Sequence, residues 1–84
     1  MMEKTITVMA SLEARPAALF VQIASKFDAS IQVKLDDKTV NAKSIMGIIS
    51  LGILDGHTVT IVADGHDEEQ AVQELANFLR NAGA

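Results

Sequence analysis

The sequence predicts an α+β fold, an open-faced sandwich in which three helices cover one face of a four-stranded antiparallel sheet. Polar and apolar residues alternate in segments 5–8, 31–35 and 58–63, as in half-buried strands. Apolar residues recur at helical spacing from about residue 14 to residue 27 and again after Asp67. The resulting order of elements is β-α-β-β-α-β-α.

The first half of the chain is predicted to form a strand, a helix and a hairpin. The strand 5–8 leads into the helix 14–27, whose first turn holds Pro16, where a missing N–H costs little. Two aspartates then make a tight turn between the strands 31–35 and 38–41. The residues expected to face the core are Ile6, Val8, Ala17, Phe20, Val21, Ala24, Phe27, Ile31, Val33 and Leu35.

The second half is predicted to form a short helix, a strand and a long helix. Gly52 is suited to end the short helix 45–51, which precedes the strand 58–63. Asp67 and Gln70 have the spacing of a capping box for the last helix, and Gly83 follows that helix. The residues expected to face the core are Ile48, Leu51, Val59, Ile61, Ala71, Val72, Leu75, Phe78 and Leu79.

Composition limits the function classes. The chain has 84 residues, which suits a single domain spanning 1–84, and it contains no cysteine for a disulfide or a thiol nucleophile. A net charge of -4 argues against direct binding of nucleic acid. Because the N-terminus lacks an apolar signal core and no run could span a membrane, we expect a soluble cytoplasmic protein without membrane contact. We expect no cofactor, since no nucleotide loop or catalytic motif is present.

Two short segments, residues 13–18 and 43–47, have the character of helix starts. A helix N-terminus carries unpaired N–H groups and partial positive charge, so it suits a phosphate. In the second segment, Ser44 has two compatible interpretations. It can cap the short helix, a contribution of about 1 kcal/mol, and it can be phosphorylated there without unfolding the helix.

These segments carry a resemblance to a known family. Residues 14–17 read Ala-Arg-Pro-Ala, and the run 38–51 follows in the right order and spacing. Together they resemble the two phosphorylation sites of HPr, the small phosphocarrier of the bacterial sugar phosphotransferase system. The resemblance covers about residues 5 to 79 and implies the HPr-like form of the open-faced sandwich.

Glu13 departs from the family pattern, because it occupies the position of the phosphohistidine. The catabolite-repression paralogue of HPr also lacks this histidine, and residues 15–22 are similar to it. The resemblance therefore implies a bacterial regulatory protein, not an enzyme, that does not transfer phosphoryl groups. It implies phosphorylation of Ser44 by an HPr kinase/phosphorylase-like enzyme. The phosphorylated form would be a corepressor for a LacI-type catabolite control regulator.

Several interpretations of Glu13 remain open. Its carboxylate can cap the first helix and face Arg15, or it can partly imitate the charge of phosphohistidine. A third interpretation is an acyl-phosphate acceptor, which would make the protein a phosphocarrier. A related alternative is a decoy that binds Enzyme I without turnover. A plain interaction domain without any phosphate role is the remaining class.

Apolar residues beside the two segments are candidates for a partner-binding surface. A core role is the alternative, but Ile48 and Leu51 already give the short helix an inward pair. Exposed apolar patches often mark interfaces, and the resemblance implies one here, with Arg15 as an electrostatic contact. The candidate apolar contacts are Leu19, Ile45, Met46 and Ile49.

Two further features concern assembly and metals. The link between Val8 and Glu13 is short, and a short hinge favours exchange of the first strand between two copies, so we expect a strand-swapped homodimer beside the monomer. His57 and His66 flank one strand without a cysteine or a nearby His/Asp pair. We therefore expect surface histidines and no metal site.

Overall fold

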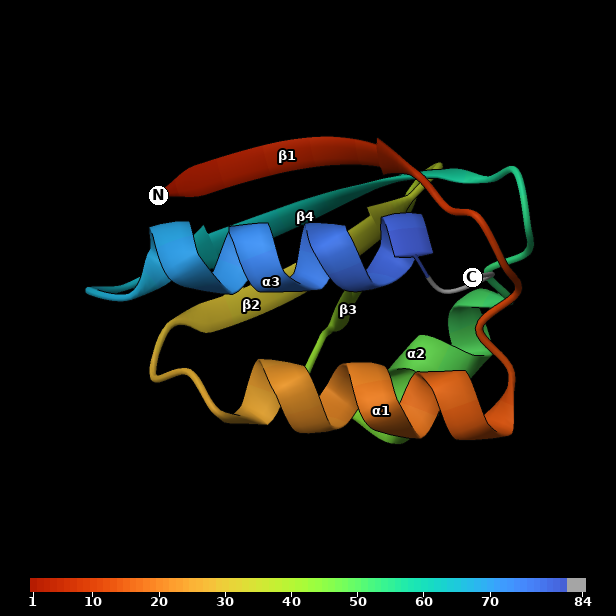
Figure 1. Ribbon diagram of the computed structural model, residues 1–84, viewed down its shortest axis with the longest axis horizontal. Coiled ribbons are helices and arrows are strands. Elements are labelled where there is room, and N and C mark those ends of the chain that lie inside the picture. The colour runs from red at the N-terminus through yellow and green to blue at the C-terminus, as the bar shows by residue number, and fades with distance from the viewer. Residues whose placement is uncertain (82–84) are drawn as a thin grey trace.

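The computed structural model describes residues 1–81 and confirms the predicted order of elements. Figure 1 shows the helices on one side of a curved, open sheet, with α1 and α3 side by side. None of the helices in residues 1–81 is long and apolar enough to cross a membrane. The elements are β1 (Met2–Thr7), α1 (Ala14–Ser25), β2 (Ser30–Leu35), β3 (Lys38–Asn41), α2 (Ile45–Leu51), β4 (Thr58–Asp64) and α3 (Glu68–Asn81).

The sheet has the strand order β1-β4-β2-β3, and every neighbouring pair is antiparallel. β1 begins earlier than predicted, because its pairing with β4 extends from Met2, opposite Ala63, to Thr7, opposite Thr58. The burial of the side chains alternates along this strand, but Lys4 occupies one of the inward positions, so the polarity of the sequence does not show the alternation. Val8, predicted to end the strand, lies just beyond it and is buried.

The core lies between the sheet and the three helices. Phe20 of α1 and Phe78 of α3 meet there with ring centroids 6.1 Å apart. Val21 and Phe78, both predicted to be buried, are only partly buried against the core. The predicted core residues that are buried are Ile6, Val8, Ala17, Phe20, Ala24, Phe27, Ile31, Val33, Leu35, Ile48, Leu51, Val59, Ile61, Ala71, Val72, Leu75 and Leu79.

α1 ends at Ser25 and not at Phe27 as predicted. The N–H groups of Lys26 and Phe27 donate to the carbonyls of Ile23 and Ala24, three residues back along the chain. This tightened last turn satisfies helix carbonyls that would otherwise lack partners. Phe27 therefore stays in the core although it lies outside the helix.

The start of α3 differs from the predicted capping box. The Asp67 carboxylate accepts the N–H groups of Asp28 and Ala29, each at 2.9 Å, so it bonds another loop and not Gln70. Glu68 instead reaches back, and its Oε1 accepts the N–H of Gly65 at 3.1 Å. The prediction for Gly83 lies outside the described residues.

The link between β1 and α1 is bonded to the loop that follows α2. The N–H of Val8 donates to the carbonyl of His57 at 2.8 Å, and the N–H of Gly56 donates back to Val8 at 2.8 Å. The N–H of Leu12 donates to the carbonyl of Ile53 at 3.0 Å. These bonds fix both ends of the link, and the buried Leu12 anchors it to the core.

Candidate phosphorylation and partner-binding site

Ser44 is the N-cap of α2, as predicted. Its Oγ accepts the N–H of Gly47 at 3.1 Å, and its backbone is extended. The turn before it is fixed by Asn41, whose side chain accepts the N–H of Lys43 at 2.8 Å and whose carbonyl accepts the N–H of Ser44 at 3.1 Å. The Ser44 side chain is half-buried. Its hydroxyl is thus held at a defined point at the start of the helix.

Gly47 allows α2 to lie close to β3. A Cβ at this position would stand 3.2 Å from the Cβ of Val40 and 3.3 Å from the Oγ of Ser44. Both separations are tighter than ordinary van der Waals contact, so a larger residue would displace the helix or the serine. The glycine therefore supports the position of the candidate phosphorylation site.

Lys43 is a positioning residue that sequence reasoning missed. Its Nζ donates to the carbonyl of Phe27 at 2.6 Å, so the ammonium group binds the chain just after α1. A cation at the C-terminal end of a helix is favourable, because unpaired carbonyls gather there. The contact ties the residue before Ser44 to α1. Sequence spacing could not have revealed it, since the two residues are 16 positions apart.

Ser50 is a poorer candidate for modification than Ser44. Its Oγ donates to the carbonyl of Gly47 at 2.7 Å, within its own helix. A phosphate on Ser50 would lose this bond and would lie near the C-terminal end of α2, where negative charge is unfavourable. This contrast makes Ser50 a natural control for Ser44.

The candidate apolar contacts are exposed, as expected for a partner surface. On α2, Ile48 and Leu51 point into the core while Met46 is 73% exposed. The other three candidates have smaller but still substantial exposed fractions: Leu19 44%, Ile45 39% and Ile49 44%. These four residues on α1 and α2 are called the apolar contact set below. Met9 and Leu54, which the sequence analysis did not single out, are also exposed.

Glu13 occupies the N-cap position of α1 but does not cap it with its side chain. Its backbone is extended, and its carbonyl accepts the N–H of Ala17 at 2.8 Å, whereas its carboxylate caps no N–H group. Within residues 1–81, it forms no ion pair with Arg15. The interpretation of Glu13 as a side-chain cap facing Arg15 is therefore wrong. Both side chains are exposed, so both charges face solvent.

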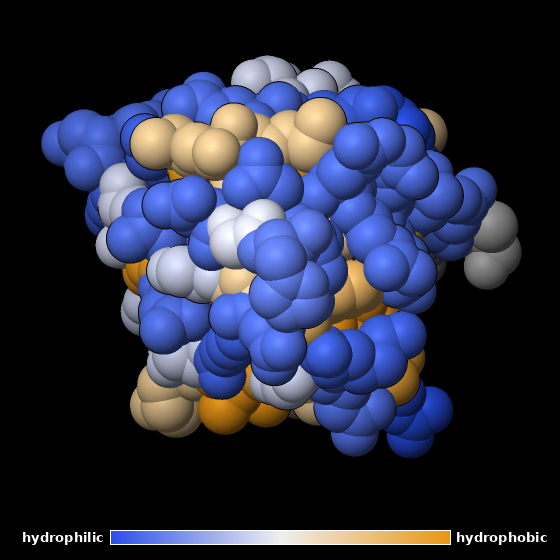
Figure 2. Space-filling model, turned by 90° about the vertical axis from the view of Figure 1, so that its left-hand side faces the viewer, coloured by the Kyte–Doolittle hydropathy of each residue, from blue (hydrophilic) through white to orange (hydrophobic). Residues whose placement is uncertain are grey.

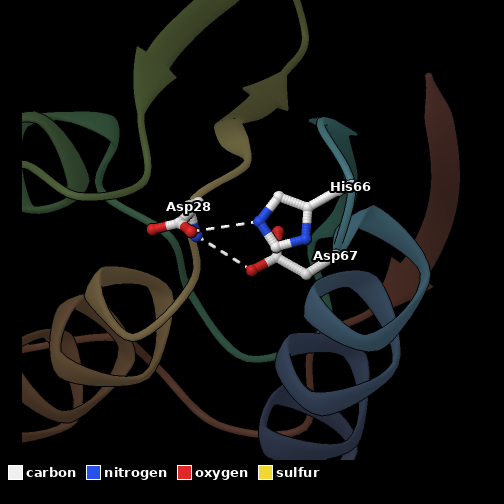
Figure 3. A group of neighbouring side chains, drawn as sticks. All are labelled: Asp28, His66 and Asp67. Carbon is white, nitrogen blue, oxygen red and sulfur yellow. Dashed lines mark hydrogen bonds and ion pairs between the residues drawn. The ribbon is translucent and has the colours of Figure 1, made fainter.

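The two histidines have different surroundings. His57 is half-buried, and its Nδ1 accepts the N–H of Leu54 at 3.0 Å within one turn. His66 is exposed, and its Nε2 lies 3.0 Å from Oδ2 of Asp28, with Asp67 beside both (Figure 3). The premise that His66 lacks a nearby acidic partner was wrong. The fold brings Asp28 there from a loop 38 positions away in the sequence.

The electrostatics of this second cluster follow from its contacts. The hydrogen bond to Asp28 and the negative charge of Asp67 raise the pKa of His66 above 6.5. The backbone N–H groups of Asp28 and Ala29 lower the pKa of Asp67. The N–H of Gly65 likewise lowers the pKa of Glu68.

The described fold and site define a small, open-faced α+β domain with an exposed carboxylate at the start of α1 and a capping serine at the start of α2. Residues 2–81 match the family model described as the PTS HPr component phosphorylation site. The chain therefore belongs to the PTS-HPr family, and the resemblance drawn from its sequence is confirmed.

Three relatives place the chain within this family. It is 48% identical to the HPr-like protein Crh of Halalkalibacterium halodurans, with 94% of this chain and 96% of the relative covered. The crystal structure of the phosphocarrier protein HPr from Bacillus anthracis is 49% identical, with a TM-score of 0.92 over 94% of this chain and 96% of that one.

The third relative is Crh from Bacillus subtilis, a catabolite repression protein whose crystal structure is described as a swapped dimer. It is 46% identical, with a TM-score of 0.77 over 88% of this chain and 85% of that one. The chain is therefore similar both to a phosphocarrier and to proteins named for catabolite repression.

Proposed function

We propose that this protein is a regulatory HPr-like protein that is phosphorylated at Ser44 and then acts as corepressor of a LacI-type catabolite control regulator. It does not transfer phosphoryl groups through a phosphohistidine. The observation that carries the proposal is the combination of an ordered capping serine at α2 with a carboxylate at the phosphohistidine position of α1. The similarity to proteins named Crh supports the same role.

Ser44 suits a switch because modification changes charge without removing a core contact. The Oγ already lies at the N-terminal end of α2, where negative charge is favourable. The phosphate adds about -1.5 to -2 charges at neutral pH and new acceptor oxygens. An HPr kinase/phosphorylase-like enzyme would add it, and the fold would stay unchanged.

The partner surface would combine charge with apolar contact. Phosphoserine and Arg15 supply charges of opposite sign, and the apolar contact set adds side chains that lose water on binding. Met46 is its most exposed member, and a flexible thioether adapts well to a partner surface. Binding should therefore depend on phosphorylation and weaken with salt.

Glu13 favours regulation over transfer. A phosphocarrier accepts and releases phosphoryl on an imidazole nitrogen, and a carboxylate differs from it in geometry and in nucleophilic character. Within residues 1–81, the exposed carboxylate caps no N–H group and forms no ion pair. The runner-up is a protein that binds Enzyme I through this surface, either as a decoy or as an acceptor on Glu13.

Two parallel labelling reactions test the proposal. The protein is incubated with Enzyme I and phosphoenolpyruvate, and separately with the serine kinase and ATP, and each product is mapped by mass spectrometry. We expect one phosphate on Ser44 in the second reaction only, lost in Ser44→Ala and retained in Ser50→Ala. Labelling of Glu13 would establish the phosphocarrier alternative. Equal affinity of both forms for the regulator would favour a plain interaction domain.

A homodimer that exchanges β1 is part of the proposal. Within residues 1–81, β4 is the one strand that pairs with β1, and the link that follows β1 is short and bonded at both ends. If β1 of one copy paired with β4 of another, every contact of the strand would be rebuilt between chains. The swapped dimer described for Bacillus subtilis Crh supports this exchange.

A further inference from the structure

We propose that Asp28, His66 and Asp67 form a binding site for a zinc ion at the end of the molecule opposite the link between β1 and α1 (Figure 1). The three residues come from the loop between α1 and β2 and from the loop between β4 and α3 (Figure 3). The site shares no residue with the positions of Ser44 and Glu13, and the proposal does not depend on the proposed regulatory function. It also departs from the expectation that no metal site would be present.

The geometry fits a small divalent cation. One ligand atom from each of the three residues lies within 4.8 Å of the others, and Nε2 of His66 lies 3.0 Å from Oδ2 of Asp28. Zinc binds nitrogen and carboxylate oxygen at about 2.0–2.2 Å, so two of its ligand atoms stand roughly 3–3.5 Å apart. The pair formed by His66 and Asp28 therefore already has the required separation.

The donor set selects a transition metal. Imidazole suits zinc and its neighbours, whereas calcium and magnesium prefer oxygen ligands alone. With neutral His66, the two carboxylates supply two negative charges to balance the dication. Glu69 lines the same hollow beside His66 and Asp67 and adds to the negative potential. A fourth position stays open for water.

Asp67 is already oriented by the backbone. Its two oxygens accept the N–H groups of Asp28 and Ala29, each at 2.9 Å, and each oxygen keeps a second lone pair. Hydrogen bonds of this kind orient ligands in known metal sites. Binding would therefore require little rearrangement of this carboxylate.

The site is open to solvent. The Asp28 and His66 side chains are 84% and 75% exposed, so an ion can enter without opening the fold. Figure 2 views the molecule from the side where these two loops lie, and its surface there is largely hydrophilic. Zinc would replace the proton between His66 and Asp28 and would join the two loops directly.

Binding should stabilise the folded protein. The ligands are brought together only by folding, because Asp28 and His66 are 38 positions apart in the sequence. A ligand that binds only the folded state raises the unfolding temperature with its concentration. The temperature shift is thus a second readout beside affinity.

Isothermal titration calorimetry of the full chain with zinc chloride tests the site, using protein without a histidine tag after treatment with chelator. From the calorimetry we expect one zinc ion per chain. In an NMR titration with the same salt, we expect amide chemical shift changes centred on the loops around Asp28 and His66. His66→Gln and Asp28→Asn should each weaken binding by at least about tenfold. His57→Gln and Asp37→Asn, matched substitutions away from the cluster, should leave the affinity unchanged. Circular dichroism checks that each variant is folded.

Several results would overturn the inference. If His66→Gln and Asp28→Asn bind zinc as tightly as the unaltered protein, the ion is adventitious. Chemical shift changes centred on His57 would place it elsewhere. Absence of measurable heat and of any rise in unfolding temperature at millimolar zinc would also refute the site.

Discussion

Gly65 lies so close to Ala29 that a Cβ added to the glycine would stand 2.7 Å from the Cα of Ala29. The two loops that hold these residues touch through backbone atoms, which cannot rotate away as a side chain can. The carboxylate of Asp67 bonds the N–H groups of the same neighbouring loop. Close backbone approach and polar bonding together set the position of α3 relative to α1.

The first prediction concerns this contact. Gly65→Ala should destabilise the fold by about 1–3 kcal/mol, the usual cost of forcing extra volume into a packed site. Urea unfolding followed by circular dichroism measures the change. Gly52→Asn is the control, because Gly52 has open space around it and asparagine tolerates its left-handed backbone, so the loss there should stay under about 1 kcal/mol. Equal losses in the two variants would contradict the argument.

The second prediction concerns the cap of α2. Ser44→Ala should cost about 1 kcal/mol of stability, because the N–H of Gly47 loses its acceptor. Ser44→Asp should keep most of that stability, since aspartate is also a good cap. Chemical unfolding compares the variants. A Ser44→Ala protein as stable as the parent would mean that water replaces the cap without cost.

The third prediction concerns the phosphohistidine position. Glu13→His should restore at least partial phosphorylation by Enzyme I and phosphoenolpyruvate, because imidazole is the missing acceptor. Acid-labile label at residue 13, measured by mass spectrometry, checks this. The unaltered protein serves as the blank and Glu13→Gln as the matched control. Failure of Glu13→His with intact Enzyme I binding would show that the short link misplaces the side chain.

The fourth prediction concerns pH in the metal-free protein. The pKa of His66 is raised in the folded state, so its pairing with Asp28 stabilises fully below pH 6.5 and is lost as pH rises through the folded pKa. The pKa of Asp67 is lowered, so its contribution is present above its unfolded pKa and is lost as pH falls through the folded one. Unfolding temperatures are measured with chelator from below the unfolded pKa of aspartate to above the folded pKa of His66. They should fall toward both the acid and the alkaline end of this range.

Single substitutions separate these two contributions. His66→Gln should reduce the loss that begins above pH 6.5 and leave the loss at higher pH that comes from the N-terminal ammonium, whose pKa the hydrogen bond to Glu68 raises. It should also weaken the acid-side contribution slightly, because the charge of His66 helps to lower the pKa of Asp67. His57→Gln should leave the alkaline loss in place, because its ring belongs to a different turn. An unchanged alkaline loss in His66→Gln would show that another group causes it.

The fifth prediction concerns the link between β1 and α1. Insertion of two flexible residues after Ala10 should shift the population from dimer to monomer, because a longer link lets β1 fold back without strain. Multi-angle light scattering at increasing concentration measures both species. An insertion of the same residues between Asp36 and Asp37, in the hairpin turn, is the control. Only monomer at millimolar concentration, before and after long incubation, would rule out the exchange.

Local patterns in the chain predicted much of the fold. Alternation placed Ile6 and Val59 in the core, because a strand turns successive side chains to opposite faces. In α2, helical spacing predicted that Ile48 is buried and Met46 exposed, because residues two positions apart lie on different faces of a helix. The capping role of Ser44 was also predictable, because it depends only on residues within one turn.

The contacts of Asp67, Lys43 and His66 could be assigned only once the loops were placed in space. Asp67 had a partner available in its own helix, yet it bonds backbone groups of Asp28 and Ala29. Lys43 likewise reaches Phe27. A side chain can bond only the groups within its reach, and folding alone decides which distant groups come within that reach. The cap at the start of α2 was therefore predictable from nearby residues, whereas the cluster around His66 required the tertiary structure.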